Sequence, residues 1–406
     1  QILLVTVLVT LSTPYGLPGL VIRTAGGDWQ QWRGPNRNGI SAETNWTSNW
    51  PADGPQALWQ ASVGIGFSSV PVSQGRAYTL GNHDDRDTLW CFDALTGRLL
   101  WRSTYPAPPG AKYYEGGPLS TPTIDRDRVY TISKWGQVLC LQAATGKGIW
   151  SHDLRQDGVT PNEWGLAGSP LIVGDRVILN AGSAGTALNR ESGRTVWSTG
   201  PRATGYASPK LCHAGGVTSV LIFAAKFLVA RDPQSGRELW RFPWRTGYDN
   251  NNPDPILDGD WIFISTYNRG AALLSLKDGR PKVLYDQPVL HEHLSPGIRL
   301  GDYLYAFDGE ARFPTNFRCL ELPTGQVKWS VTDPAFGSLI CADGKLLILS
   351  ESGELLVANP SPSGFKLLAR AQVLGGRCWT PPVLANGLLY VRNARGDLRC
   401  LDLRRN

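Results

Sequence analysis

The stretch TALNRESGRTVW, residues 186–197, holds a Ser-Gly pair followed four residues after the glycine by tryptophan. The same arrangement, with Thr or Ser before the glycine, recurs along the chain at intervals of about 40 to 50 residues, a spacing typical of repeated structural units. The further copies are WCFDALTGRLLW (90–101), LCLQAATGKGIW (139–150), LVARDPQSGRELW (228–240) and RCLELPTGQVKW (318–329). The sequence therefore predicts an array of similar units.

Each unit contains four short runs rich in β-branched and aromatic residues, separated by Gly, Asp and Asn, as in antiparallel strands. A Ser-Pro or Thr-Pro pair lies near the start of several units, as at Ser169-Pro170. The glycine of the Thr/Ser-Gly pair suits a turn with positive φ, and the Asp, Asn or Glu four residues earlier is placed to bond back to the turn backbone. Four-stranded repeats of this length are typical of propeller blades.

The units add up to an all-β, eight-bladed β-propeller of four-stranded antiparallel blades. In blade five the tryptophan position falls on Val283, and blade seven is degenerate. The last unit stops after three strands, and the segment PQALWQ, with Trp59 in the tryptophan position, can supply the fourth. We therefore expect an N-terminal strand to complete the last blade and close the ring, which removes two exposed edges.

The chain divides into a signal peptide and leader (1–27), an N-terminal extension (28–55) and the propeller (56–406). Residues 2–11, ILLVTVLVTL, form an uncharged apolar run that is short for a spanning helix and suited to a signal peptide. We expect an exported product, periplasmic or extracellular, with no transmembrane segment in the mature chain.

Four of the seven cysteines (Cys91, Cys140, Cys319 and Cys400) occupy the same position in different blades, so we expect unpaired core residues rather than disulfides. The formal charge of +6 is modest, and Lys and Arg are scattered, which argues against a nucleic-acid partner. We expect a monomer.

The loops that enter the innermost strands should converge on one face around the central channel, which makes this face the candidate site for a protein or small-molecule ligand. Three alternatives remain open there. The oxygen-rich run from Asp249 to Asp254 suits a hard cation, although turn capping explains it as well. His291 and His293, two apart, suit a transition metal if they share a strand face. Buried carboxylates suit general acid–base chemistry, with Asp249, Asp254 and Glu163 as candidates.

The repeated pattern Ala/Cys-x-Asp/Asn-x-x-Thr/Ser-Gly-x-x-x-Trp is similar to the tryptophan-docking motif of pyrroloquinoline quinone (PQQ) proteins. The chain resembles exported PQQ-binding-like β-propeller repeat proteins of planctomycete-type bacteria, within the quinoprotein alcohol dehydrogenase-like superfamily. The opener WQQWRGPNRNGIS (29–41) and the late blades, such as LSESGELLVA (349–358), carry this resemblance.

The resemblance implies two classes of function. The first is a ligand-binding or protein-binding scaffold that uses the loop face, as in the outer-membrane assembly propellers that share the repeat without a cofactor. The second is a PQQ- and Ca²⁺-dependent oxidoreductase acting on alcohols or sugars. For the second class, Asp254 and Glu163 are the catalytic candidates. The cofactor-binding candidates are Glu115, Arg202, Tyr206, Asn252 and Trp379, and the metal candidates are Asp249, Asn252, Asp254, His291 and His293.

The scaffold class is favoured because the quinoprotein dehydrogenases clamp PQQ with a disulfide between adjacent cysteines, and this sequence has no adjacent cysteines.

Overall fold

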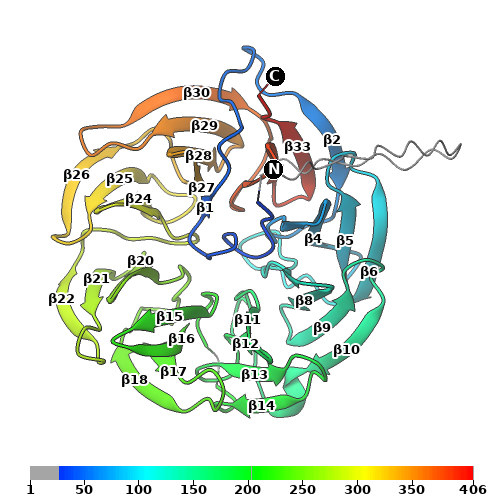
Figure 1. The fold of residues 1–406 in the computed structure, drawn as a ribbon, viewed down its shortest axis with the longest axis vertical. Helices are drawn as coiled ribbons and strands as arrows, with labels where there is room; N and C mark the ends of the chain where they lie inside the picture. The colour runs from blue at the N-terminus through cyan, green and yellow to red at the C-terminus, as the bar shows by residue number, and fades with distance from the viewer. Residues whose placement is uncertain (1–26, 203, 406) are drawn as a thin grey trace, which may run out of the picture.

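The computed structural model describes residues 27–202 and 204–405. The strands form eight sheets arranged as a ring (Figure 1). Blade one contains β3 (Val72–Ser73), β4 (Arg76–His83), β5 (Arg86–Asp93) and β6 (Leu99–Pro106), and blade two contains β7 (Thr123–Asp125), β8 (Arg128–Ile132), β9 (Gln137–Gln142) and β10 (Gly148–Asp153). Blade three contains β11 (Leu171–Val173), β12 (Arg176–Leu179), β13 (Thr186–Asn189) and β14 (Thr195–Ser198). Blade four contains β15 (Lys210–Ala214), β16 (Val217–Phe223), β17 (Phe227–Arg231) and β18 (Glu238–Pro243).

Blade five contains β19 (Ile256–Asp258), β20 (Trp261–Thr266), β21 (Gly270–Ser275) and β22 (Lys282–Gln287), and blade six contains β23 (Ile298–Leu300), β24 (Tyr303–Asp308), β25 (Asn316–Glu321) and β26 (Gln326–Val331). Blade seven contains β27 (Gly337–Ala342), β28 (Lys345–Ser350), β29 (Glu354–Asn359) and β30 (Lys366–Gln372). Blade eight contains β31 (Val383–Ala385), β32 (Leu388–Arg392) and β33 (Asp397–Asp402) together with β2 (Ala57–Ser62). Strand β1 (Ile40–Ser41) joins blade seven, and one short 3-10 helix, η1 (Leu154–Asp157), lies outside the sheets.

The ring closes as the sequence predicts. Strand β2 pairs antiparallel with β33, so that Trp59 lies opposite Cys400 and Ala57 lies opposite Leu401. The first and last parts of the propeller therefore share one blade, and Figure 1 shows β2 beside β33 near the C-terminus. The predicted signal peptide falls mostly on residues 1–26, outside the described residues.

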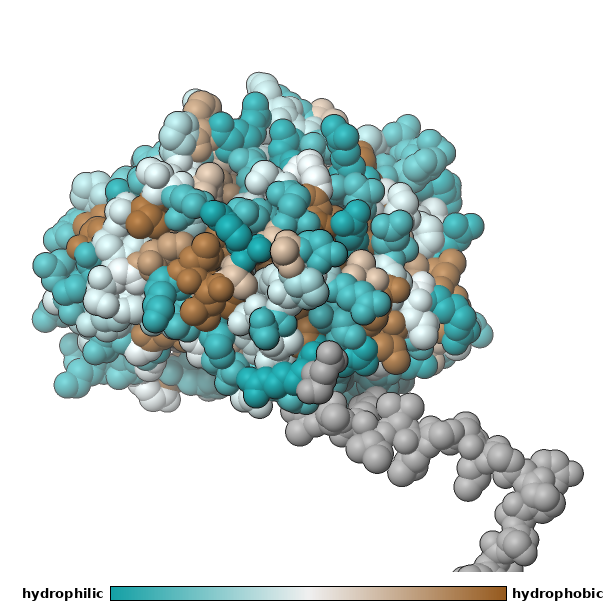
Figure 2. Space-filling view, turned by 90° about the horizontal axis from the view of Figure 1, so that it is seen from above, coloured by the Kyte–Doolittle hydropathy of each residue, from teal (hydrophilic) through white to brown (hydrophobic). Residues whose placement is uncertain are grey.

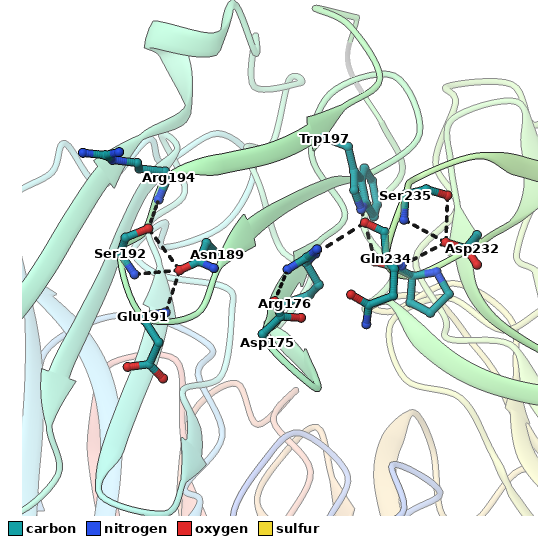
Figure 3. Close-up of polar contacts among 11 residues, drawn as sticks. Asp175, Arg176, Asn189, Glu191, Ser192, Arg194, Trp197, Asp232, Gln234 and Ser235 are labelled. Carbon is teal, nitrogen blue, oxygen red and sulfur yellow. Dashed lines mark hydrogen bonds and ion pairs between the residues drawn. The ribbon is translucent and has the colours of Figure 1, made fainter.

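Five of the repeat tryptophans each bond to the following blade. Trp197 donates its indole N–H to the carbonyl of Pro233 in the following blade at 3.2 Å (Figure 3). Trp59, Trp101, Trp150 and Trp329 make the same bond to Ala94, Ala143, Arg190 and Ser361. The predicted turn bonds are also present, since Asn189 accepts from the backbone N–H of Ser192. The residues of the repeat pattern thus form the contacts that hold neighbouring blades together.

Blade five corrects one prediction. Val283 does not fill the tryptophan position, because the connection after Gly279 is longer there and the slot falls on Tyr285, opposite Leu273. The Tyr285 hydroxyl donates to the carbonyl of Leu322 at 2.9 Å, the bond that tryptophan makes elsewhere.

The glycine of the docking turn is placed where a side chain would strike the tryptophan of the preceding blade. Gly193 has φ +70°, and a Cβ built there would lie 2.5 Å from Cε3 of Trp150, whereas Gly279 has φ +74° and open space. Both Gly→Ala changes carry backbone strain, and only Gly193→Ala also displaces an indole. We expect Gly193→Ala to lower the free energy of unfolding by about 1–3 kcal/mol more than Gly279→Ala does. Equal losses in denaturant titrations would contradict this packing role.

The cysteine prediction is confirmed: all seven cysteines are buried and unpaired. Cys91, Cys140, Cys319 and Cys400 each lie directly opposite a docking tryptophan across the ladder. A small residue at this position leaves room for the indole on the adjoining strand.

A second set of bonds links the starts of the innermost strands. The backbone N–H of Ser69 donates to the Thr121 hydroxyl at 3.0 Å, and Thr121 donates in turn to Ser169 at 2.9 Å. The relay continues from Ser169 to Ser208 at 3.1 Å and ends at the Asp254 carboxylate at 2.7 Å. The Ser-Pro and Thr-Pro pairs of the sequence therefore hold five consecutive blades together around the axis.

The axis itself is occupied by the N-terminal segment 28–43, here called the hub segment. Figure 1 shows this part of the chain crossing the centre of the ring. At its ends, Trp29 pairs with Val72 in blade one, and Glu43 accepts from the backbone N–H groups of Asn386 and Gly387 in blade eight. Because these partners lie at the turns between first and second strands, both ends of the hub segment lie at the face opposite the entry loops.

The hub segment bonds to every blade. Besides blades one and eight, its backbone bonds to blade two through Gln30 and to blade seven through β1. Its side chains reach the remaining four blades. Arg37 donates to the carbonyls of Pro170 and Pro209 in blades three and four, Trp32 donates to Asp254 in blade five, and Arg33 donates to Pro296 and Gly297 in blade six. The sequence did not reveal this role, although its opener is dense in Trp and Arg.

Candidate binding site at the mouth of the channel

The entry loops converge, as predicted, around the mouth of the channel on the face away from the ends of the hub segment. Lys112 pairs with Glu163, which joins the loops that enter blades two and three. Arg377 pairs with Glu115, which joins the loops of blades eight and two. Arg312, from the loop between β24 and β25, donates to the Tyr113 carbonyl at 2.9 Å and links blade six with the entry loop of blade two, on the opposite side of the ring.

Aromatic side chains line this mouth. Trp379 stacks on Phe67 with ring centroids 5.3 Å apart, and its indole N–H donates to Glu351. Arg377 lies over the other side of this cluster, 4.7 Å from the Trp379 ring. Tyr206, at the far side of the mouth, contacts Trp164 edge to face at 5.8 Å. The cofactor-binding candidates Trp379 and Tyr206 therefore belong to the packed wall of the mouth.

Lys134 is a buried cation at the mouth that the sequence did not single out. Its ammonium donates to the Pro109 and Gly110 carbonyls and to the Tyr114 hydroxyl, and it lies 4.8 Å from the Tyr114 ring. Burial lowers its pKa to about 8. Because each of its three ammonium protons has an acceptor, we interpret Lys134 as a residue that holds the loop carrying Tyr113 in place, rather than as a nucleophile.

Three aromatic side chains at the mouth are the most exposed large apolar residues of the described chain. Tyr113 is 72%, Tyr248 70% and Phe313 60% exposed. Each one has, or directly adjoins, a residue with positive φ: Tyr113 itself at 68°, Asp249 at 54° and Arg312 at 75°. Non-glycine residues in this region of φ are strained, and such strain tends to occur at functional sites.

The catalytic candidates Asp254 and Glu163 lie in different environments, one buried and one at the rim of the mouth. Asp254 is buried, and its two oxygens accept from the Trp32 indole at 2.8 Å and from the Ser208 N–H at 2.7 Å. Glu163 is half-exposed and paired with Lys112 at the rim of the mouth. The structure therefore does not bring the two carboxylates together, and their catalytic role stays a prediction.

The metal candidates are also divided among separate partners. His291 Nδ1 lies 2.9 Å from Asp308 Oδ1, while His293 accepts from the Ala311 N–H at 3.0 Å and packs on Tyr267. Burial lowers the pKa of His293 to about 4. Asp249 lies 3.6 Å from Lys226 at the exposed mouth. Within residues 27–202 and 204–405, no three His, Cys, Asp or Glu side chains are grouped so that they could hold a metal ion.

The residues at the axis do not fit PQQ with Ca²⁺. A calcium site needs several free oxygen ligands, whereas both oxygens of Asp254 are engaged and three cations, Arg33, Arg37 and Lys210, surround it. Burial lowers the pKa of the two guanidiniums to about 10 and that of Lys210 to about 8, and the Asp254 charge opposes each shift. The three positive side chains around Asp254 would therefore repel a calcium ion bound there. Asn252 is partly buried beside this cluster, and Arg202 is exposed.

Glu292, buried close to Arg33, gives a pH prediction. Burial raises its pKa to about 8, against the opposing effects of the Gly297 N–H and the Arg33 charge, with Asp308 adding to the rise. A raised carboxyl pKa means that its stabilising contribution is complete below pH 4.5 and is lost as pH rises toward 8. We expect Glu292→Gln, which keeps an acceptor for Gly297, to flatten the loss of melting temperature between pH 5 and pH 8.5. Glu310→Gln should leave that loss intact, and an unchanged slope in Glu292→Gln would contradict the assignment.

With the geometry established, comparison with known proteins identifies the family. A sequence model described as "Outer membrane protein assembly factor BamB" matches residues 43–130 and 109–331. The chain belongs to this family of PQQ-like β-propeller repeat proteins. The family prediction is thereby confirmed, while the planctomycete-type origin stays a prediction.

Individual relatives fall into two groups. Outer membrane protein assembly factor BamB from Burkholderia pseudomallei is 26% identical over 263 residues, 52% of this chain and 66% of the relative. Quinoprotein ethanol dehydrogenase from Pseudomonas aeruginosa is 27% identical over 150 residues, 32% of this chain and 24% of the enzyme. The chain thus spans about two thirds of the first relative and about a quarter of the second.

Among solved structures, BamB from Moraxella catarrhalis superposes with a TM-score of 0.62 at 17% identity, covering 86% of this chain and 99% of that one. This likeness concerns the fold alone. In the described part of the chain, no helix combines the length and the apolar character that crossing a bilayer would require.

Proposed function

We propose that this protein is an exported scaffold that binds another protein through the mouth of its channel, on the entry-loop face. The observation that carries the proposal is the position of Tyr113, Tyr248 and Phe313, the three most exposed large apolar side chains among the residues that the structure describes. Tyrosine and phenylalanine are enriched at protein interfaces, and exposed aromatic groups are unfavourable in water unless a partner covers them.

The rim of the ring is a weaker candidate for the interface. Figure 2 looks onto the rim and shows mostly hydrophilic side chains broken by hydrophobic clusters of limited size. The exposed aliphatic residues of the outer strands, such as Leu99, Val196 and Val283, are distributed over separate blades. Scattered apolar residues are ordinary on a protein surface, whereas a set gathered around one opening favours recognition.

The family supports the scaffold class and the compartment. The BamB relatives are named as outer membrane protein assembly factors, and they match more of this chain than the quinoprotein dehydrogenase does. The apolar run at residues 2–11 favours export to the periplasm or beyond. The alternative, a PQQ-dependent oxidoreductase, has less support because the cations at the axis do not fit its cofactor pair.

The proposal can be tested by photo-crosslinking in cells that make the protein. A photoreactive phenylalanine is placed singly at Tyr113, Tyr248 and Phe313, and in a control at Val217, which is 49% exposed at the start of β16, beside the β15–β16 turn on the opposite face. We expect one and the same protein to be crosslinked from the three mouth positions and not from Val217.

The companion variant carries Tyr113→Ser, Tyr248→Ser and Phe313→Ser together. Aromatic anchors at an interface each contribute about 1–4 kcal/mol, so recovery of the crosslinked partner should fall at least about tenfold with an unchanged melting temperature. An identical crosslinked product from Val217, or full recovery of the partner by the triple variant, would rule out the mouth as the interface.

A further inference from the structure

A groove lies between blades eight and one, on their outer half. It is a half-open hollow of about 340 Å³ between the end of β2 and the β4–β5–β6 sheet of blade one, and Thr88, Trp90, Arg102 and Thr104 form one wall. The ladder places Trp90 opposite Arg102 and Thr88 opposite Thr104, so these four side chains share one face of the sheet. This volume is at the lower end of the range of about 300–1,000 Å³ for small-molecule sites.

The lengths of the strands create the groove. Strands β4, β5 and β6 each have 8 residues, whereas β2 has 6 and ends at Ser62, so blade one extends past its neighbour. At the base, Gly81 permits the two backbones to meet, because a Cβ there would lie 1.8 Å from the Val63 carbonyl oxygen. The floor of the groove is therefore polar backbone rather than apolar side chain.

The groove is lined by two arginines and one acidic residue, so its net charge is positive. Arg86 and Arg102 line it, and neither makes an ion pair or a side-chain hydrogen bond to any residue in the parts of the chain that the structure describes. The acidic residue, Asp84, is highly exposed, and its carboxylate lies 2.8 Å from Nδ1 of His83. Arg102 lies 5.6 Å from the centroid of Trp90, whose indole is fixed by a 3.0 Å bond to the Val63 carbonyl. One guanidinium is thus held over the groove by a fixed aromatic ring.

Hydroxyl groups complete the lining. The Thr88 and Thr104 hydroxyls lie 3.0 Å apart, and each has further capacity to donate or accept. Guanidinium groups bind carboxylate and sulfate in bidentate fashion, while paired hydroxyls and backbone groups match the hydroxyls of a sugar ring. We propose that this groove binds an anionic sugar unit, with Arg86 and Arg102 holding its carboxylate or sulfate and Thr88 and Thr104 contacting the ring hydroxyls.

A nucleotide is a poorer match for the same charge. The Trp90 ring lies parallel to Phe92, at 9° with centroids 6.0 Å apart, and Arg102 covers it as well. A base therefore lacks an open aromatic face on which to stack, which is the main contact of single-stranded nucleic acids with proteins. The inference is independent of the proposed function, since it uses none of the mouth residues.

The test is calorimetric titration of the whole protein with a galacturonic acid tetrasaccharide, with its neutral methyl ester and with a sulfated tetrasaccharide. We expect at least one acidic saccharide to bind with a dissociation constant below about 1 mM, and the methyl ester to bind at least about tenfold more weakly. The variant Arg86→Gln/Arg102→Gln should lose at least about tenfold in affinity, and added salt should weaken the wild type. Its matched control, Arg98→Gln/Arg194→Gln, changes two exposed arginines outside the groove and should bind as the wild type does.

Several results would overturn the inference. These are failure of both acidic saccharides to bind, equal affinity for the methyl ester, or an equal loss in both arginine double variants. Inorganic sulfate binding as tightly as the sulfated saccharide would show a simple anion site, and tighter binding of a tetranucleotide would show a nucleic-acid site. Circular dichroism of each variant verifies that the ring remains folded, so a loss of affinity reports on the groove.

Discussion

Replacing Arg392 with methionine is expected to lower the free energy of unfolding by about 3–5 kcal/mol, because several buried hydrogen bonds from one charged group to neutral acceptors are lost together. Arg392 is 1% exposed at the end of β32 in the closing blade. One of its terminal nitrogens donates to Ser68 O, Thr79 Oγ1 and Leu80 O at 3.1, 2.9 and 2.7 Å. The other donates to Gly64 O and Gly66 O at 3.2 and 3.0 Å.

These five acceptors belong to blade one and to the segment that leads into it, so Arg392 fastens the last blade to the first. Burial lowers its pKa to about 9, which leaves it charged at neutral pH and suited to bind carbonyl oxygens. Methionine would fill part of the volume and remove the donor for the buried carbonyls of Gly64, Gly66 and Leu80, while Ser68 O keeps its bond from the Thr79 hydroxyl. Denaturant titration measures the effect, with Arg395→Met, exposed and three residues away, as the control. A loss for Arg392→Met no larger than for Arg395→Met would refute its role in closure.

The sequence was sufficient for the architecture because the docking motif is local. Its tryptophan, turn glycine and Asx residue lie within twelve positions, and the same geometry repeats in successive blades, so the pattern predicts the blades and the pairing of Trp59 with Cys400. The prediction for blade five is wrong at one position, because only the strand register in the structure shows that Tyr285, and not Val283, takes the place of the tryptophan.

The site was less predictable because its contacts join distant segments. Asp254 was selected as an oxygen-rich loop residue, but its partner Trp32 lies 222 positions away in a segment without a repeat pattern. His291 and His293 are neighbours in sequence, yet they bond to different residues, Asp308 and Ala311. The exposure of Tyr113, Tyr248 and Phe313 depends on how the loops fold over the mouth, which composition alone does not reveal.

Asp254→Ala is the second change from which we expect a large effect, a loss of about 3–5 kcal/mol in the free energy of unfolding. The substitution removes the acceptor for the Trp32 indole, the end of the Ser/Thr relay at Ser208, and the counter-charge of Arg33, Arg37 and Lys210 together. Those three cations, two from the hub segment and Lys210 from β15, are buried, so water cannot replace the lost carboxylate without opening the axis.

The outcome separates a structural carboxylate from a catalytic one. A residue poised for acid–base chemistry can usually be truncated without unfolding the protein, whereas a residue that anchors the hub segment cannot. We therefore expect Asp254→Ala to shift the denaturation midpoint strongly and to expose the hub segment to protease, while Asp249→Ala, in the same loop but at the exposed mouth, changes neither. Asp254→Asn, which keeps one of the two acceptor oxygens and loses the charge, should show a loss between those of Asp254→Ala and Asp249→Ala. If Asp254→Ala is as stable as the wild type, the hub is held by its backbone bonds alone, and the electrostatic argument for the axis is wrong.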